Sequence, residues 1–346
     1  MINVGIIGLG KMGKMHFSNS LFHKRVNIAA VADVSPQNLN WARKRAQINT
    51  YNDYEKMIKS EQLDAVIIAL PHFLHKPCSS YAAENNISIF LEKPIANNFK
   101  DGKEIIDNVQ KHGVKFTVGC NCRFIDSVVK LKEVYDQGRL GDIELSTFDN
   151  IGNGPFSPFL EPKPIPDWYF DPKEVGGGAL LDLGFHMIDL FNWFFKSPKL
   201  EYAFFYNRYD LPYEDSVILI LKSEKTNTKG IMNLGWFSRS IFPKFDFRVT
   251  LHGTVDFDST DRYVPNLYTN AVKEGLKNIS RKVIRRPIQP LSYTYYYHSY
   301  YKEIENFYDS VIQDTNPLVT PEDSLKTMEI IQNSYDTYYS GKNATQ

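Results

Sequence analysis

A lysine stands at the end of an apolar segment, where its ammonium group could act on a bound substrate. The segment reads FLEKPIA and places Glu92, Lys93 and Pro94 after residues typical of a buried strand. Pro94 restricts the backbone of the residue before it, so it would fix the direction in which Lys93 points. Lysines at strand ends are usually solvated caps. By itself, the segment is therefore compatible with a catalytic lysine and with a surface one.

Polar residues, among them Asp182, His186 and Asp189, interrupt the apolar stretch GGGALLDLGFHMIDLFNWFF. Asp182 and His186 are four residues apart, which on a helix puts both side chains on one face and within reach of each other. The carboxylate could orient the imidazole for proton transfer or hold a substrate hydroxyl. The alternative is an Asp-His pair that satisfies its own hydrogen bonds in the core. Because spacing supplies no third ligand, we expect no metal here.

The first strand-like segment runs into the glycine pattern GLGKMG, residues 8–13, which then opens a helical stretch. Gly8 permits a tight turn, Gly10 lets the backbone approach a pyrophosphate, and Gly13 lets the helix pack on the strand. Asp33 ends the next strand roughly 20 residues further on, where it would accept hydrogen bonds from ribose hydroxyls. It would also repel a 2′-phosphate, so the pattern favours NAD and leaves NADP open. A glycine-rich turn with a surface aspartate is the simpler alternative.

Two histidines follow another strand-like segment, in IIALPHFLHKP. His72 and His75 come just after Pro71, in a loop of the kind that often carries function. Contact with a ligand and exposure to solvent are both open for His72. For His75 we expect a structural role, in which it braces the loop beside the nicotinamide.

Short apolar runs alternate with helical patterns through the first third of the chain. This predicts a parallel sheet covered on both faces, with the functional residues at the carboxyl ends of its strands. After a long loop over 150–178, strand-like runs follow one another without helices between them, which predicts a large, mainly antiparallel open sheet. The predicted fold is thus α/β followed by α+β, with a Rossmann domain over 1–121 and a substrate-binding and oligomerisation domain over 122–346.

The composition excludes several classes of protein. The 346 residues carry 40 Lys plus Arg and 40 Asp plus Glu, so no overall field recruits nucleic acid or an acidic membrane surface. The sequence contains no apolar run long enough for a membrane span and no signal peptide. Its three cysteines form no metal-ligand pattern and read as reduced thiols. We therefore expect a cytoplasmic protein that binds neither nucleic acid nor membranes.

Taken together, the glycine pattern, Asp33, the Glu-Lys-Pro motif and GGGALLDLGFH resemble the glucose-fructose oxidoreductase, inositol dehydrogenase and rhizopine catabolism (Gfo/Idh/MocA) family. The resemblance extends to GCNCRF, WYFDP, EDSVILIL and LVTPEDSLKTMEIIQ. It implies an NAD(P)-dependent sugar or polyol dehydrogenase or reductase that forms homodimers or homotetramers through the second sheet. One departure is LPHFLH, where many members have a Thr-Pro-Asn sequence, so that His72 replaces a common asparagine.

The resemblance also assigns roles to individual residues. Lys93 would bind the reacting hydroxyl or carbonyl, while Asp182 and His186 would be the catalytic aspartate and histidine. An imidazole that titrates near neutrality suits the removal of a hydroxyl proton, so His186 is the expected base, and Lys93 would stabilise the developing alkoxide. The residues expected to contact the cofactor are Gly8, Gly10, Lys11, Met12, Gly13, Asp33, Leu70, His72, His75, Glu92 and Lys93.

Substrate selection is assigned to the second domain. A basic run, KNISRKVIRR over 277–286, precedes the tyrosine-rich YTYYYHSYYKE, and its cations could meet the diphosphate of a nucleotide-linked sugar or simply be solvated. The candidate substrate contacts are Arg123, Trp168, Tyr295, Tyr297 and His298. Two other functions stay open on this fold. One is a dinucleotide-sensing regulator, and the other is an enzyme that keeps NAD bound and uses transient oxidation for elimination or glycoside cleavage.

Overall fold

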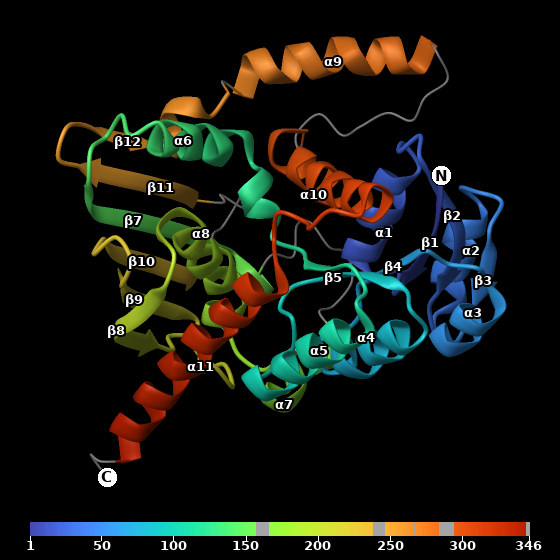
Figure 1. Ribbon diagram of the computed structural model, residues 1–346, viewed down its shortest axis with the longest axis horizontal. Coiled ribbons are helices and arrows are strands. Elements are labelled where there is room, and N and C mark those ends of the chain that lie inside the picture. Colours follow the sequence, from blue (N-terminus) through green and yellow to red (C-terminus); the bar gives the residue numbers. More distant parts are fainter. Residues whose placement is uncertain (157–165, 238–245, 266, 284–293, 344–346) are drawn as a thin grey trace.

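The computed structural model describes residues 1–156, 166–237, 246–265, 267–283 and 294–343. Within these residues the chain forms two six-stranded sheets, each with its own helices (Figure 1). Both predicted sheets are present. None of the described helices combines the length and the apolar character needed to cross a lipid bilayer. All three cysteines are buried free thiols, as expected.

The first sheet is parallel and has the order β3-β2-β1-β4-β5-β6. This is the strand order of a Rossmann domain, which confirms the prediction. Every residue of β4 is buried, because helices cover both faces of the sheet. The elements of this domain are β1 Ile2–Ile7, α1 Lys11–Ser20, β2 Val26–Ala32, α2 Pro36–Arg43, β3 Asn49–Tyr51, α3 Tyr54–Ser60, β4 Ala65–Ile68, α4 His75–Glu84, β5 Ser88–Leu91, α5 Phe99–His112 and β6 Phe116–Val118.

The second sheet has the order β12-β11-β7-β10-β9-β8 and is mainly antiparallel, with one parallel pair, β10 and β7. The prediction of a large open sheet is therefore confirmed. Its strands are β7 Ile143–Gly152, β8 Pro198–Tyr206, β9 Ser216–Ser223, β10 Lys229–Trp236, β11 Asp246–Gly253 and β12 Phe257–Ser259. The other elements of this half are α6 Asp126–Asp136, α7 Pro172–Val175, α8 Phe185–Phe195, α9 Leu267–Val283, α10 Thr294–Gln313 and α11 Pro321–Asn343.

The two faces of this sheet differ. Helices α8 and α11 pack over one face, where alternate residues such as Leu219 and Met232 are fully buried. On the other face Phe204 pairs with Ile218 across β8 and β9, and both side chains are largely exposed. The alternation of buried and exposed residues along each strand produces this difference.

The end of the chain returns to the Rossmann domain. Ile304, Phe307 and Tyr308 of α10 are buried in one apolar cluster with β1 and α1 residues, including Ile6 and Phe17. Helices α1 and α10 therefore lie side by side (Figure 1). The helical spacing of Tyr296, Tyr300, Ile304, Phe307 and Val311 predicts that most of these side chains lie in the core. Ile304 and Phe307 are buried, Tyr300 and Val311 are partly buried, and the side chain of Tyr296 lies outside the described residues.

Candidate functional site

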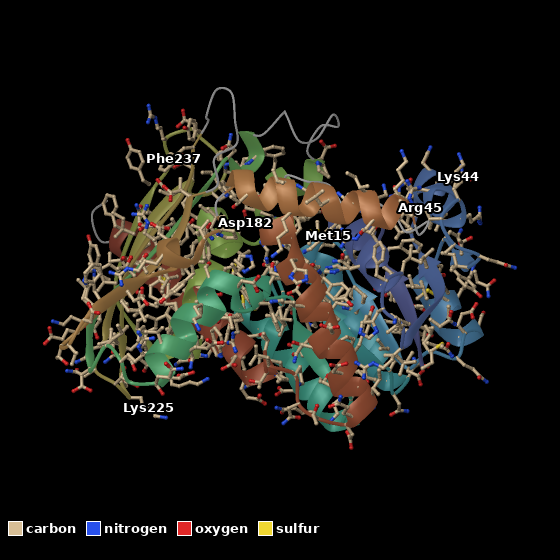
Figure 2. All side chains as sticks on the ribbon, turned by 90° about the horizontal axis from the view of Figure 1, so that it is seen from above. Met15, Lys44, Arg45, Asp182, Lys225 and Phe237 are labelled. Carbon is tan, nitrogen blue, oxygen red and sulfur yellow. The ribbon has the colours of Figure 1, made fainter. Side chains whose placement is uncertain are left out.

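The Rossmann domain and the second domain meet at an ion pair. Lys93 follows β5, and its Nζ lies 2.5 Å from Oδ1 of Asp182 and 3.1 Å from the carbonyl oxygen of the same residue. Oδ2 of Asp182 accepts a hydrogen bond of 3.2 Å from Nε1 of Trp236, at the end of β10. Figure 2 shows Asp182 near the middle of the molecule, between the open sheet and the Rossmann domain. Lys93 thus points toward the second domain and is not a solvated cap.

His186 belongs to the same apolar helical segment as Asp182 and lies close to the Lys93–Asp182 pair. Residues Leu180–Gly184 form a π-helical turn that leads into α8, which begins at Phe185. This turn changes the helical spacing between Asp182 and His186, and among the described residues no hydrogen bond joins them. Nδ1 of His186 is buried without a hydrogen-bond partner. Lys93 and Trp236, rather than His186, therefore orient the Asp182 carboxylate, and the expected orientation of the imidazole by Asp182 is not found.

The charges of the site fix its protonation states. Burial disfavours the ammonium of Lys93, but the Asp182 carboxylate outweighs this effect and raises the pKa of Lys93. Burial also disfavours ionised Asp182, but Lys93 lowers the pKa of that carboxyl below its ordinary value. Burial, followed by the charge on Lys93, lowers the pKa of His186 to about 3. At neutral pH the site therefore holds a cation, a carboxylate and a neutral imidazole. The expectation that His186 titrates near neutral pH is wrong, because burial and the charge on Lys93 both disfavour its protonated form.

A second buried cluster lies behind the lysine. Glu92 accepts hydrogen bonds from Nε2 of His16 on α1 and, at 3.2 Å, from the backbone N–H of Lys93. Glu303 of α10 joins them, and both of its carboxylate oxygens are buried without a hydrogen-bond partner. The ligand atoms of His16, Glu92 and Glu303 lie within 4.8 Å of one another, which makes them the group among the described residues that could hold a metal ion. Burial, and then the charge on Glu92, raises the pKa of Glu303 well above its usual value.

The two loop histidines have different surroundings. His75 is fully buried, and its ring nitrogens lie 2.9 Å from the carbonyl oxygens of Pro94 and Leu70. It braces the loop after β4 against the turn that follows Lys93, and its contact with the cofactor stays a prediction. His72 reaches the second domain, where its Nδ1 lies 2.8 Å from the carbonyl oxygen of Val175. Burial, and then His75, lowers the pKa of His72 to about 3, so its ring is neutral.

Aromatic side chains surround Asp182 on the side of the second domain. Trp168 meets His72 edge to face, with ring centroids 5.2 Å apart. Tyr169 packs on Trp236 at 6.1 Å, and the hydroxyl of Tyr213 donates a 2.7 Å hydrogen bond to the Tyr169 carbonyl. Trp168 is thus linked to the site through His72 and Tyr169, and its contact with a substrate stays a prediction. Sequence reasoning missed Trp236, at the end of β10, and Tyr213, in the segment before β9, because both reach the site only through tertiary packing.

The glycine turn has the shape that a dinucleotide requires. Gly8 has a positive φ of 88°, and a Cβ there would lie 2.3 Å from the carbonyl oxygen of Ala69. A Cβ on Gly13 would clash with the Gly8 carbonyl oxygen, whereas a Cβ on Gly10 would meet nothing within 4 Å. No side chain caps the N-terminus of α1 at Gly10, so its N–H groups are available to an anion. The residues present therefore fit a pyrophosphate approaching Gly10.

Asp33 is held firmly at the end of β2. Its carboxylate accepts hydrogen bonds from the backbone N–H of Leu9 at 2.6 Å and of Ser35 at 2.7 Å. The side-chain amide of Asn38 adds two longer contacts of 3.2 and 3.3 Å. A carboxylate fixed beside the glycine turn is suited to ribose hydroxyls and disfavours a 2′-phosphate.

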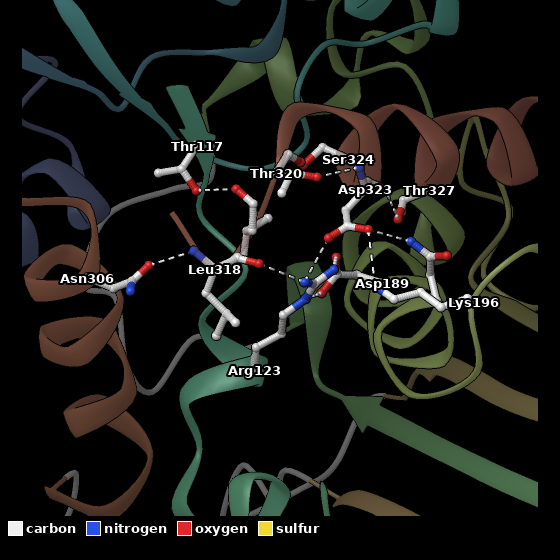
Figure 3. Close-up of polar contacts among 12 residues, drawn as sticks. Thr117, Arg123, Asp189, Lys196, Asn306, Leu318, Thr320, Asp323, Ser324 and Thr327 are labelled. Atoms are coloured by element: carbon white, nitrogen blue, oxygen red, sulfur yellow. Dashed lines mark hydrogen bonds and ion pairs between the residues drawn. The ribbon is translucent and has the colours of Figure 1, made fainter. Parts of the chain in front are cut away.

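Arg123 lies in a buried network away from solvent. Its guanidinium pairs with Asp189 through Nε and Nη2, at 2.8 and 2.7 Å, and with Asp323 of α11 at 2.9 Å (Figure 3). It also donates a 3.1 Å hydrogen bond to the Leu318 carbonyl oxygen. These contacts occupy the guanidinium with structural partners, so we do not include Arg123 in the proposed substrate site.

The remaining candidates lie at the start of α10. His298 is exposed and stacks on Tyr301 with ring centroids 6.0 Å apart, while Tyr297 is half-buried against Tyr300. The side chain of Tyr295 and all of Arg285 and Arg286 lie outside the described residues. None of these contacts connects α10 to Lys93 or Asp182, so Tyr295, Tyr297 and His298 stay predictions.

These features define a class of protein: a dinucleotide-binding Rossmann domain whose strand-end lysine meets a carboxylate and an imidazole from an open-sheet domain. Residues 2–120 match the model of the oxidoreductase family with an NAD-binding Rossmann fold, and residues 128–255 match the GFO/IDH/MocA C-terminal domain. The chain belongs to the Gfo/Idh/MocA family, as its resemblance predicts.

Curated relatives with known names are similar to parts of the chain. The rhizopine catabolism protein MocA of Rhizobium meliloti is 29% identical over 55% of this chain and 56% of that protein. The myo-inositol 2-dehydrogenase of Thermotoga maritima is 26% identical over 55% and 53%. The 2,7-anhydro-N-acetylneuraminate hydratase of Escherichia coli is 29% identical over 41% and 38%. The chain thus matches about half the length of these relatives, or less.

Solved structures resemble the whole fold. The scyllo-inositol dehydrogenase of Lactobacillus casei, with bound NAD(H) and scyllo-inositol, superposes with a TM-score of 0.76 at 22% identity and covers 98% of both chains. The WlbA dehydrogenase of Bordetella pertussis, in complex with NADH and UDP-GlcNAcA, has a TM-score of 0.80 at 19% identity and covers 98% of this chain and 96% of that one. At these identities the likeness shows a shared fold.

Proposed function

We propose that the protein is an NAD-dependent oxidoreductase that transfers a hydride between nicotinamide C4 and a secondary alcohol or ketone of a sugar, sugar derivative or polyol. The observation that carries this proposal is the Lys93–Asp182 ion pair, with neutral His186 beside it, where the two domains meet. NAD, when bound, supplies the hydride acceptor or donor. The free glycine turn and Asp33 are the residues that would hold it.

Each residue of the site has a distinct role. The ammonium of Lys93 binds the substrate oxygen and stabilises the negative charge that develops on it during oxidation. We assign the hydroxyl proton to His186 because its Nδ1 is buried without a described hydrogen-bond partner. Its pKa of about 3 makes it a weaker base than an ordinary imidazole, so the stabilisation of the alkoxide by Lys93 must supply part of the driving force. Asp182 keeps Lys93 protonated and aimed, and Trp236 holds Asp182 in place. In reduction, His186 returns the proton.

A panel of sugars and polyols, followed by the nicotinamide absorbance, tests this function. Inositols and a nucleotide-linked sugar belong in the panel because the relatives' names include an inositol dehydrogenase and a protein bound to UDP-GlcNAcA. Turnover with at least one alcohol and NAD is the expected result. A preference for NADP would contradict the role given to Asp33.

A second function is favoured by one specific similarity, the hydratase relative. In that case NAD stays bound, and transient oxidation of the substrate makes a neighbouring group leave, so no net change in nicotinamide absorbance occurs. Co-purification of non-exchanging NAD, with product formed in the absence of added NAD, would favour this reading. A dinucleotide-sensing regulator is less well supported, since a sensor has no need for Lys93, Asp182 and His186 together.

We also propose that the protein forms a homodimer or homotetramer through the exposed face of the second sheet. Five large apolar side chains are largely exposed on strands β8, β9 and β10: Tyr202, Phe204, Tyr206, Ile218 and Ile231. An apolar face of this kind marks a protein interface. The double variant Phe204→Asp/Ile218→Asp should reduce the mass measured by light scattering to that of one chain.

A further inference from the structure

Helix α9 carries an apolar stripe on its outer side. Val272, Leu276, Ile279 and Val283 follow helical spacing, and their exposed fractions are 65%, 64%, 64% and 77%. Asn278, a polar residue on the opposite side of the helix, is buried. An ordinary surface helix shows the reverse arrangement, with its apolar side inward. The outer stripe of α9 therefore lacks the partner that its composition calls for.

Among the described residues, no side chain covers the stripe of α9, since its four aliphatic members keep exposed fractions of 64–77%. The buried Asn278 indicates that the other side of the helix packs on the molecule. Figure 1 shows α9 along the upper edge of the molecule, and in Figure 2, which is seen from above, the orange helix α9 crosses the side that faces the viewer. Its 17 residues give a rod about 25 Å long. The stripe is thus open to a large surface outside the monomer.

The charges of α9 complement an anionic surface. The helix contains four cations, Lys273, Lys277, Arg281 and Lys282, and one acid, Glu274. With 3.6 residues per turn, Lys273 lies beyond one edge of the stripe and Lys282 beyond the other, whereas Lys277 and Arg281 lie on the side away from the stripe. The basic run continues into Arg285 and Arg286 in the sequence. This concentration of positive charge contrasts with a chain whose formal net charge is zero.

The chemistry of the stripe favours lipid over protein. Its described members are all aliphatic, whereas protein interfaces draw their binding energy mainly from Trp, Tyr and Arg anchors. An aliphatic stripe with cations on both flanks is the pattern of a helix that lies in the plane of a bilayer, with its lysines extending to the headgroups. We propose that α9 docks the protein on an anionic lipid surface.

This proposal departs from the expectation that the protein has no membrane partner. That expectation rested on the balanced overall charge and on the absence of a membrane-spanning segment, and neither feature bears on a helix that lies on a bilayer. The proposal is independent of the function proposed for Lys93 and His186, because α9 holds none of the residues of that site.

Vesicle sedimentation of the full-length protein tests the proposal. The probes are vesicles of phosphatidylcholine alone and of phosphatidylcholine mixed with phosphatidylglycerol, at low and high salt. One variant, Leu276→Ser/Ile279→Ser, removes the stripe and keeps the charges. A second, Lys273→Gln/Lys277→Gln/Arg281→Gln/Lys282→Gln, removes the charges and keeps the stripe. The matched control neutralises four exposed lysines elsewhere, Lys24→Gln/Lys56→Gln/Lys103→Gln/Lys111→Gln.

The wild type and the control should sediment with the anionic vesicles at low salt and only weakly at high salt. With neutral vesicles, both proteins should stay in the supernatant. Each α9 variant should lower the partition onto anionic vesicles at least about tenfold, with the circular dichroism spectrum unchanged. No vesicle binding by the wild type, or equal binding by all variants, would overturn the proposal. It is also overturned if the stripe variant only changes the oligomer mass, which assigns the stripe to a second copy. The proposal is overturned as well if the wild type binds no vesicles and the charge variant has a higher KM for a nucleotide-linked sugar. That result would assign the cations of α9 to a substrate phosphate.

Discussion

Nζ of Lys93 lies 2.5 Å from Oδ1 of Asp182, across the junction of the two domains. This pair fixes the charge of both groups, because each shifts the pKa of the other toward its ionised form. A substrate oxygen that approaches the lysine would meet an ammonium already oriented by the second domain. The reactive site therefore takes residues from both domains, with Lys93 from the first and Asp182 from the second.

Asp182→Asn should shift the alkaline limb of the pH profile of kcat/KM to lower pH. Without the carboxylate, burial lowers the pKa of Lys93, so the ammonium is lost at a lower pH than in the wild type. The pH dependence of kcat/KM measures this, and the maximum should also fall about tenfold to a hundredfold. Asp107→Asn, an exposed change on α5, is the control and should leave the profile unchanged. An unshifted alkaline limb in Asp182→Asn would show that Asp182 does not govern Lys93.

Gly10→Ala should separate cofactor binding from folding. The added methyl group meets no protein atom within 4 Å, so thermal stability should stay near that of the wild type. It occupies the space where a pyrophosphate approaches the backbone, so NAD affinity should fall at least about tenfold. Calorimetric titration with NAD and a thermal melt give the two readings. Unchanged NAD affinity would place the pyrophosphate elsewhere.

Much of this arrangement follows from local sequence. The Rossmann sheet is predicted by the continuous apolar runs, because strands buried on both faces need no polar alternation. The spacing of the glycines determines the tight turn after β1, and Asp33 ends the next strand, so the geometry of both is also predictable from the sequence. The capping of α11 by Thr320, whose Oγ1 accepts from the N–H of Asp323 at 3.2 Å, is equally local.

Contacts that depend on tertiary packing could not be predicted. The π-helical turn at Leu180–Gly184 is accommodated by Glu214, which accepts hydrogen bonds from the backbone N–H groups of Gly178 and Leu180 at 3.1 and 2.9 Å. Nothing in the sequence around Asp182 signals this partner, so the helical spacing alone suggested direct contact with His186. The cluster of His16, Glu92 and Glu303 similarly forms only because α10 packs against the Rossmann domain.

Arg123→Met should destabilise the fold rather than weaken substrate binding. It leaves the buried carboxyl of Asp189 without its guanidinium partner, which costs about 3–5 kcal/mol in the free energy of unfolding. Adding Asp189→Asn should recover part of that loss, and Arg139→Met, at an exposed position, should cost less than about 1 kcal/mol. Urea denaturation measures all three. A stable Arg123→Met protein with a raised KM would return Arg123 to the substrate site.

Glu303→Gln should stabilise the protein above about pH 4.5. The folded state keeps Glu303 protonated because its pKa is raised, whereas the unfolded chain releases the proton near the ordinary value of 4.5. Stability is therefore lost as the pH rises through that range, and a neutral glutamine avoids the loss. The free energy of unfolding near neutral pH should rise by about 1–2 kcal/mol. Glu305→Gln, on the same helix and half-exposed, is the control. A destabilised Glu303→Gln would indicate that the carboxylate is ionised and bound, as a metal ligand would be.

The central claim is that Lys93 and His186 carry out the hydride transfer step. Single-turnover mixing of NAD-loaded enzyme with the best alcohol of the panel, followed by nicotinamide absorbance, isolates that step in the wild type, Lys93→Met and His186→Asn. Each variant should transfer hydride about 10²- to 10⁴-fold more slowly, with NAD affinity within about threefold of the wild type. Undiminished transfer in both variants would contradict the assignment.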